Sequence, residues 1–150
     1  MIAIESDQKM KEFGEKIGRT FRGGECIELV GDVGAGKTTL TKGIAKGLSI
    51  DEPIQSPTFT VNRMYEARDG LTLAHYDFYR LHDAGIMANE LDEVANDPNT
   101  VTVIEWSGVV QDVLPADRLT FTITPTDEAS RNVELIAGGN RSRIIKEQLV

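Results

Sequence analysis

This sequence has little cysteine and no long apolar run. Cys26 is the only cysteine among the 150 residues, so no disulfide can form within the chain. No run of 18 apolar residues occurs, and residues 1–10 do not show the charged and then apolar pattern of a secretory leader. We therefore expect a cytoplasmic protein without a membrane partner, folded as a single domain over residues 1–150.

Positive charge is also scarce, and the stretch from Leu81 to Asp117 contains neither lysine nor arginine. The whole chain has 16 basic and 24 acidic residues, which gives a net charge of -8. An acidic surface repels nucleic acid, so we expect no DNA partner and only indirect contact with any RNA. Most acids of the stretch are expected to form a solvated face, although a basic protein could also dock there.

Glycine is concentrated around one motif, Gly31–Thr39, which reads GDVGAGKTT. It matches G-x-x-x-x-G-K-[ST], a pattern whose backbone N–H groups surround phosphates while its lysine reaches the terminal ones. The apolar segment Cys26–Val30 before it predicts a strand, and the four-residue spacing of the apolar residues after it predicts a helix. An ordinary glycine-rich turn would not require this order. The residues expected at the phosphates are Gly34, Ala35, Gly36, Lys37, Thr38 and Thr39.

The rest of the chain alternates helical and extended patterns. Ser6 is expected to cap a first helix, and further helices are expected from about 83 to 95 and after 138–140. Residues 56–65 and 71–77 predict an antiparallel hairpin with a turn at 68–70, and residues 119–124 and 132–136 predict two more strands. The almost continuous apolar and β-branched run 100–104 predicts a central parallel strand. The predicted fold is therefore α/β with a mixed sheet.

Three residues could perform phosphate chemistry together with Lys37. The hydroxyl of Thr38 suits a magnesium ion, and Glu105 ends the apolar run where P-loop proteins place a second metal-associated acid. The alternative for Glu105 is an exposed acid at a strand end. Asp77 ends another predicted strand and could orient water or support the metal, or it could only cap the turn that follows.

Other candidates have weaker patterns. Ser56 and Thr58 lie where many nucleotide switches sense the γ-phosphate, but they could equally be ordinary strand hydroxyls. Trp106 follows Glu105 and could stack in the site, stack on a partner or belong to the core. His75 and His82 have no cysteine or acid at metal-ligand spacing, so structural or surface roles are expected for both.

Taken in order, four pieces resemble the TsaE family, also called YjeE, of small bacterial P-loop ATPases. The pieces are Gly31–Thr39, Ser56–Thr60 (SPTFT), His75–Leu81 (HYDFYRL) and Ile104–Trp106 (IEW). Departures are Ser107 to Val110, where many relatives have an acid, and the shifted stretch Asn89–Val94 (NELDEV). They leave the predicted nucleotide site intact.

The resemblance implies a three-layer α/β/α fold of the P-loop NTPase kind, with a central parallel sheet and antiparallel strands beside it. It implies ATP and Mg²⁺ as cofactors, with Thr38 and Glu105 at the metal and functional roles for Asp77 and Trp106. Asp7 and Arg131 fall where the family contacts nucleotide. It further implies weak ATP hydrolysis by the chain alone, and a complex with TsaD and TsaB that makes threonylcarbamoyladenosine (t6A) in tRNA.

Two other functions fit a P-loop chain of this length. A small-molecule kinase needs an acceptor pocket and commonly an arginine-bearing lid, and the arginine-free stretch from Leu81 to Asp117 occupies a natural lid region. A nucleotide-sensing module would bind without meaningful hydrolysis. A GTPase is disfavoured because the Asn-Lys-x-Asp guanine signature is absent.

Overall fold

The computed structural model describes residues 1–55, 61–79, 81, 83 and 85–149. Within them the chain forms a seven-stranded sheet in the order β1-β7-β6-β2-β5-β4-β3. The strands β6, β2, β5 and β4 run parallel to one another, whereas β3 pairs antiparallel with β4 and β7 pairs antiparallel with β6 and β1. The predicted mixed sheet is confirmed. The strands are β1 (Ile2–Ile4), β2 (Cys26–Val30), β3 (Asn62–Glu66), β4 (Thr72–Asp77), β5 (Thr100–Glu105), β6 (Leu119–Pro125) and β7 (Arg131–Ala137).

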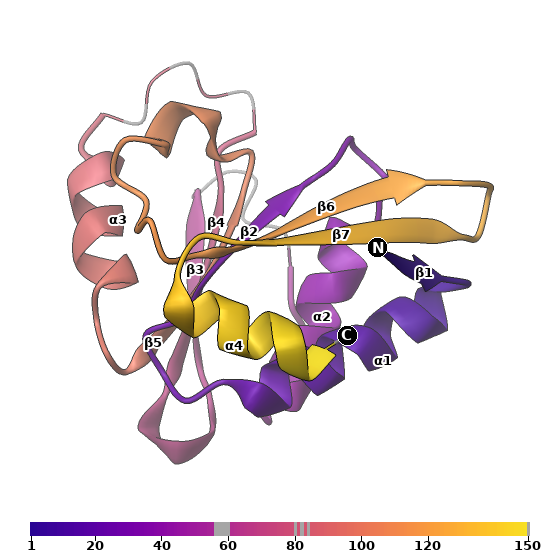
Figure 1. Cartoon of the computed structure of the whole chain (residues 1–150). Coiled ribbons are helices and arrows are strands. Elements are labelled where there is room, and N and C mark those ends of the chain that lie inside the picture. The colour runs from indigo at the N-terminus through magenta and orange to yellow at the C-terminus, as the bar shows by residue number, and fades with distance from the viewer. Residues whose placement is uncertain (56–60, 80, 82, 84, 150) are drawn as a thin grey trace.

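Helices cover both faces of the sheet, as a three-layer fold requires (Figure 1). One face carries α1 (Asp7–Thr20), α2 (Lys37–Gly47) and α4 (Asn140–Leu149), and the other carries α3 (Met87–Ala95) and the short 3-10 turn η2 (Ser107–Val110). The sheet separates two apolar cores, one on each face. Successive side chains of a strand point to opposite faces, so neighbouring residues of one strand can belong to different cores. Ile27 and Leu29 of β2 belong to the core under α1 and α2, whereas Cys26 belongs to the core under α3.

Two element boundaries differ from the sequence expectation by more than one residue, and one strand was not predicted. The helix expected from about 83 begins at Met87, because Gly85 has a left-handed φ of 56° and its N–H donates to Asp83. The strand β3 begins at Asn62, and the earlier part of the segment expected there lies outside the described residues. β1 is too short to show a periodic pattern and exists through its pairing with β7. No helix in the described part is both long and apolar enough to cross a bilayer.

Glycines bring the backbones of the helices α1 and α2 into close contact. A Cβ atom built on Gly18 of α1 would lie 2.3 Å from the carbonyl oxygen of Ile44, and one on Gly43 of α2 would lie 2.3 Å from that of Lys11. The helices run in the same direction, because successive glycines of α1 meet successive glycines of α2. This contact places Asp7, the first residue of α1, at the same end as the phosphate-binding loop.

A buried carboxylate ties β2 to the elements beside it. Glu28 is 4% exposed and lies on the α3 side of the sheet. Its Oε1 accepts hydrogen bonds from Arg118 Nε at 3.0 Å and Thr120 Oγ1 at 2.8 Å, and its Oε2 accepts from Ser107 Oγ and from Gln111 Nε2 at 2.6 Å. Burial raises the pKa of this carboxyl, but these hydrogen bonds together outweigh burial and lower the pKa from 4.5 to about 2.

The Glu28 network should make stability depend on pH below 5. Because the folded-state pKa is the lower one, ionised Glu28 stabilises the fold above pH 4.5, and that contribution is lost as pH falls toward 2. It amounts to on the order of 3 kcal/mol. Urea unfolding at pH 7, 4 and 2.5 should show a steeper loss for the wild type than for Glu28→Gln. Equal pH slopes for the two proteins would contradict this assignment.

Candidate functional site

A pocket of about 450 Å³ lies at the carboxyl ends of β2, β4 and β5. It gathers side chains from positions 7 to 131, because the parallel strands end at one edge of the sheet. Ala35 is buried in the loop and does not line the pocket, and Ser56 and Thr58 lie outside the described residues. Every other residue predicted for the site lines it: Asp7, Gly34, Gly36, Lys37, Thr38, Thr39, Asp77, Glu105, Trp106 and Arg131.

The loop between β2 and α2 has the shape of an anion cradle. Gly34 and Gly36 have φ values of 83° and 112°, which only glycine adopts without strain, and a Cβ on Gly34 would meet nothing within 4 Å. The first N–H groups of α2 have no partner within the helix and carry its positive dipole end, so they attract a phosphate. The open space at Gly34 leaves the backbone accessible to such a ligand.

Arg131 braces this loop from the neighbouring strand β7. Its Nε donates to the carbonyl oxygen of Ala35 at 3.0 Å, and a terminal nitrogen lies 3.4 Å from that of Gly34. The other terminal nitrogen donates to backbone carbonyls of residues 127–130. The guanidinium therefore already holds two turns together where it lines the pocket. The nucleotide contact implied for Arg131 remains a prediction.

Lys37 lies folded back over its own loop. Its Nζ donates to the carbonyl oxygen of Gly31 at 2.5 Å and lies 3.8 Å from the centroid of the Trp106 ring. Burial lowers the pKa of the ammonium, and the negative charges of Glu105 and Asp77 partly offset that effect. A weakly hydrated ammonium with one carbonyl partner is well prepared to exchange that partner for a phosphate oxygen.

Glu105 is not the exposed strand-end acid that the sequence also allowed. It is 3% exposed, and its Oε2 lies 2.6 Å from Nε2 of the fully buried His75. A carboxylate only accepts hydrogen bonds, so with Glu105 ionised the ring donates from Nε2. His75 Nδ1 has no hydrogen-bond partner among the residues that the structure describes. The structural role that the sequence allowed for His75 agrees with this burial, but its partner was missed, because Glu105 lies 30 residues away and meets it only through the pairing of β4 with β5.

Asp77 lies directly opposite Glu105 in the pairing of β4 with β5. Its Oδ1 accepts the N–H of Tyr79 at 2.9 Å, so it does cap the following turn, as one interpretation of the sequence expected. It also lines the pocket, so the capping contact does not remove it from the site. The role of Asp77 in orienting water remains a prediction.

Trp106 contacts two residues of the pocket and is only half-buried. Its ring packs on Tyr79 with centroids 4.8 Å apart and lies under the ammonium of Lys37. Its backbone is left-handed, with φ 55° and ψ 52°, a conformation that is strained for an aromatic residue. Such strain persists only where the surroundings impose it, and in this conformation the ring lies against the ammonium of Lys37.

The donor chemistry of the pocket fits magnesium. Among the described residues no group of three or more histidine, cysteine or acidic side chains could hold a metal ion by itself. Mg²⁺ does not need such a cage, because it keeps several waters and binds one or two protein oxygens together with substrate phosphates. Thr38 and Glu105 supply a hydroxyl and a carboxylate at this pocket.

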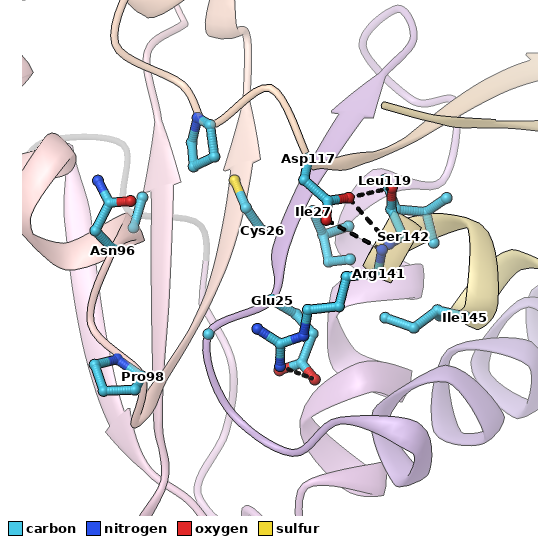
Figure 2. A pocket seen from close by; sticks show the side chains of 13 residues that line it. Glu25, Cys26, Ile27, Asn96, Pro98, Asp117, Leu119, Arg141, Ser142 and Ile145 are labelled. Carbon is cyan, nitrogen blue, oxygen red and sulfur yellow. Dashed lines mark hydrogen bonds and ion pairs between the residues drawn. The ribbon is translucent and has the colours of Figure 1, made fainter. Parts of the chain in front are cut away.

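A second cavity, of about 280 Å³, lies at the opposite edge of the sheet, around the residues that begin β2 and β6 (Figure 2). The charged groups drawn there already have partners within the cavity wall. Glu25 accepts from Arg141, and Asp117 accepts from Ser142 Oγ at 2.6 Å. Burial raises the pKa of the Cys26 thiol to about 12, so it stays protonated and a poor nucleophile. The loop pocket is therefore the candidate functional site.

Comparison with known proteins identifies the family of this chain. A family model described as "Threonylcarbamoyl adenosine biosynthesis protein TsaE" matches residues 4–133. The chain belongs to the TsaE family. The matched range spans the site from Asp7 to Arg131, so the resemblance seen in four short pieces extends over the whole pocket.

Relatives within the TsaE family come from several bacteria. A protein of Bacillus subtilis named "tRNA threonylcarbamoyladenosine biosynthesis protein TsaE" is 39% identical over 84% of this chain and 78% of its own length. A protein of the same name from Streptomyces coelicolor is 34% identical over 88% of this chain and 93% of its own. A crystal structure of YdiB from Bacillus subtilis superposes with a TM-score of 0.80 at 30% identity, covering 99% of this chain and 91% of that one.

Proposed function

We propose that this chain is a Mg²⁺-dependent ATPase that serves the synthesis of threonylcarbamoyladenosine in tRNA. Membership in the TsaE family supports the pathway. The observation that carries the ATPase is the convergence of Lys37, Thr38 and Glu105 on one pocket at the end of a phosphate-binding loop. In keeping with the family, hydrolysis is expected to be slow for the chain alone and to change in a complex with TsaD and TsaB.

Each residue of the pocket has a distinct task in this proposal. The loop N–H groups and Lys37 bind the phosphates, and Lys37 leaves the carbonyl of Gly31 to do so. A magnesium ion, when bound, would neutralise charge on the phosphate oxygens. Thr38 and Glu105 would hold it directly or through water, and His75 keeps the Glu105 carboxylate in one orientation. Asp77 orients the attacking water.

RNA contact is assigned to the partners rather than to this chain. The net charge of -8 disfavours direct binding of a polyanion, and no basic residue occurs from Leu81 to Asp117. Action on tRNA would then pass through the complex with TsaD and TsaB, in the cytoplasm. The chain's own contribution is the nucleotide cycle.

The test is to measure Mg²⁺-dependent ATP turnover for the wild type and for Glu105→Ala, alone and with TsaD and TsaB. Wild-type turnover should change when the partners are added. Glu105→Ala should lower kcat by roughly 100-fold with a smaller effect on nucleotide binding, because the lost carboxylate acts on transition-state charge.

Glu134→Ala is the matched control, since Glu134 is an exposed acid on β7 that does not line the pocket. It should behave like the wild type in every arm. If Glu105→Ala hydrolyses ATP normally, the metal assignment is wrong. If the partners neither alter turnover nor co-elute with the chain, the proposed complex is wrong.

A further inference from the structure

The left-handed backbone conformation of Trp106 must be stabilised by contacts with the surrounding residues. A left-handed conformation costs a non-glycine residue on the order of 1 kcal/mol or more, so the ring would leave its place over Lys37 unless other contacts opposed that change. The ring packs on Tyr79 and against the core under α3, but these contacts act on the ring and not on the turn that follows it. A hollow of about 390 Å³ lies beside that turn, lined by Trp106, Ser107, Gly108 and Gln111 together with residues of β2 and the loop after it.

The contacts that oppose the change come from Glu28. Its Oε2 accepts hydrogen bonds from Ser107 Oγ and from Gln111 Nε2, and these two residues bracket the turn η2 that begins directly after Trp106. Ser107 is itself buried, at 6% exposed. Glu28 therefore fixes both ends of the turn, and the turn determines where the tryptophan backbone stands.

The Glu28 side chain is itself held in place by other residues, so it does not move with η2 if η2 shifts. Its second oxygen, Oε1, accepts hydrogen bonds from Arg118 and Thr120, which belong to β6 or to the residue before it. Two sides of one carboxylate thus bind two different elements. Hydrogen bonds to a buried ionised group are among the stronger ones in proteins. Glu28 lies on β2, and β2 leads directly into the phosphate-binding loop.

We propose that Glu28 is a positioning residue, which acts through Ser107 and Gln111 to hold the Trp106 ring against Lys37. This inference rests on the proposed ATPase only for its consequence in turnover, since the contact between Trp106 and Lys37 is made by two side chains of this chain. The ring limits the positions open to the ammonium before phosphate arrives. Releasing the turn should therefore free the ring and slow the reaction.

The two sides of the Glu28 carboxylate provide a matched pair of variants. Ser107→Ala removes a donor on the side of the turn, and Thr120→Val removes a donor on the side of β6. Each loses one hydrogen bond to Glu28, so both should lower the melting temperature. Trp106 is the only tryptophan, so its fluorescence reports this position alone. Without nucleotide, Ser107→Ala should shift the emission to longer wavelength. Thr120→Val should leave it unchanged, because Arg118 still donates to the same oxygen of Glu28.

Turnover should separate the same pair, with kcat/KM for ATP lowered roughly tenfold in Ser107→Ala and unchanged in Thr120→Val. Glu28→Gln, which keeps the size of the side chain, should reproduce the shifted emission if Ser107→Ala does not fold. Equal emission in Ser107→Ala and Thr120→Val would overturn the proposal, and so would shifted emission with unchanged turnover. A wild type without ATPase activity would defeat the proposed function, while the emission comparison would still test the contact.

Discussion

Replacing Lys37 with alanine is expected to lower kcat/KM for ATP by about 100- to 1,000-fold, the loss typical of removing one preorganised charge donor from a reacting oxyanion. The effect is large because Lys37 as a residue is only 6% exposed and burial already lowers the pKa of its ammonium, so little water screens its interaction with a phosphate. The measurement is steady-state turnover together with binding of a fluorescent ATP analogue.

Lys42→Ala is the control for this experiment. Lys42 lies on the same helix α2, five residues further along, but its side chain is exposed and does not line the pocket. It should retain wild-type binding and turnover. Loss of activity in both variants would point to damage to α2 rather than to the missing charge. Wild-type turnover in Lys37→Ala would exclude the loop pocket as the site of phosphate chemistry.

The main features of the site were predictable because they depend on local pattern. The motif Gly31–Thr39 specifies its own conformation through its glycines, and the apolar strand before it and the periodic helix after it follow from spacing alone. The run 100–104 followed by Glu105 identified a buried parallel strand with an acid at its end, and both features are present. Asp77 and Glu105 were each expected at the end of a strand, and the parallel pairing of β4 with β5 places the two directly opposite each other.

What was not predictable depends on contacts between distant residues. His75 meets Glu105 across two strands, and nothing at short spacing signals that pair. Glu28 lies within an apolar strand, and its carboxylate is buried on one face of the sheet. Four side chains distant in the sequence donate hydrogen bonds to that carboxylate. The left-handed backbone of Trp106 is likewise imposed by its surroundings, because tryptophan has no intrinsic preference for it. Register and tertiary packing, rather than propensity, decide all three.

Gly43→Ala is expected to destabilise the fold by about 1–3 kcal/mol, the range for overpacking a close contact. The sign of the stability change is informative, because in an ordinary helix interior alanine is more favourable than glycine by up to about 1 kcal/mol. Here the added Cβ would lie 2.3 Å from the carbonyl oxygen of Lys11, and backbone cannot move aside as a flexible side chain can. Urea unfolding at pH 7 measures the change.

Gly108→Ala is the matched control, because a Cβ there would meet nothing within 4 Å and its backbone is not left-handed. It should change stability by less than about 0.5 kcal/mol. The glycine contact also has a consequence at the site, since it places Asp7 and the start of α2 at the same pocket. Gly43→Ala should therefore weaken nucleotide binding under conditions where the variant is still folded. A more stable Gly43→Ala protein would mean that the helices are not in backbone contact and that Asp7 is held by other interactions.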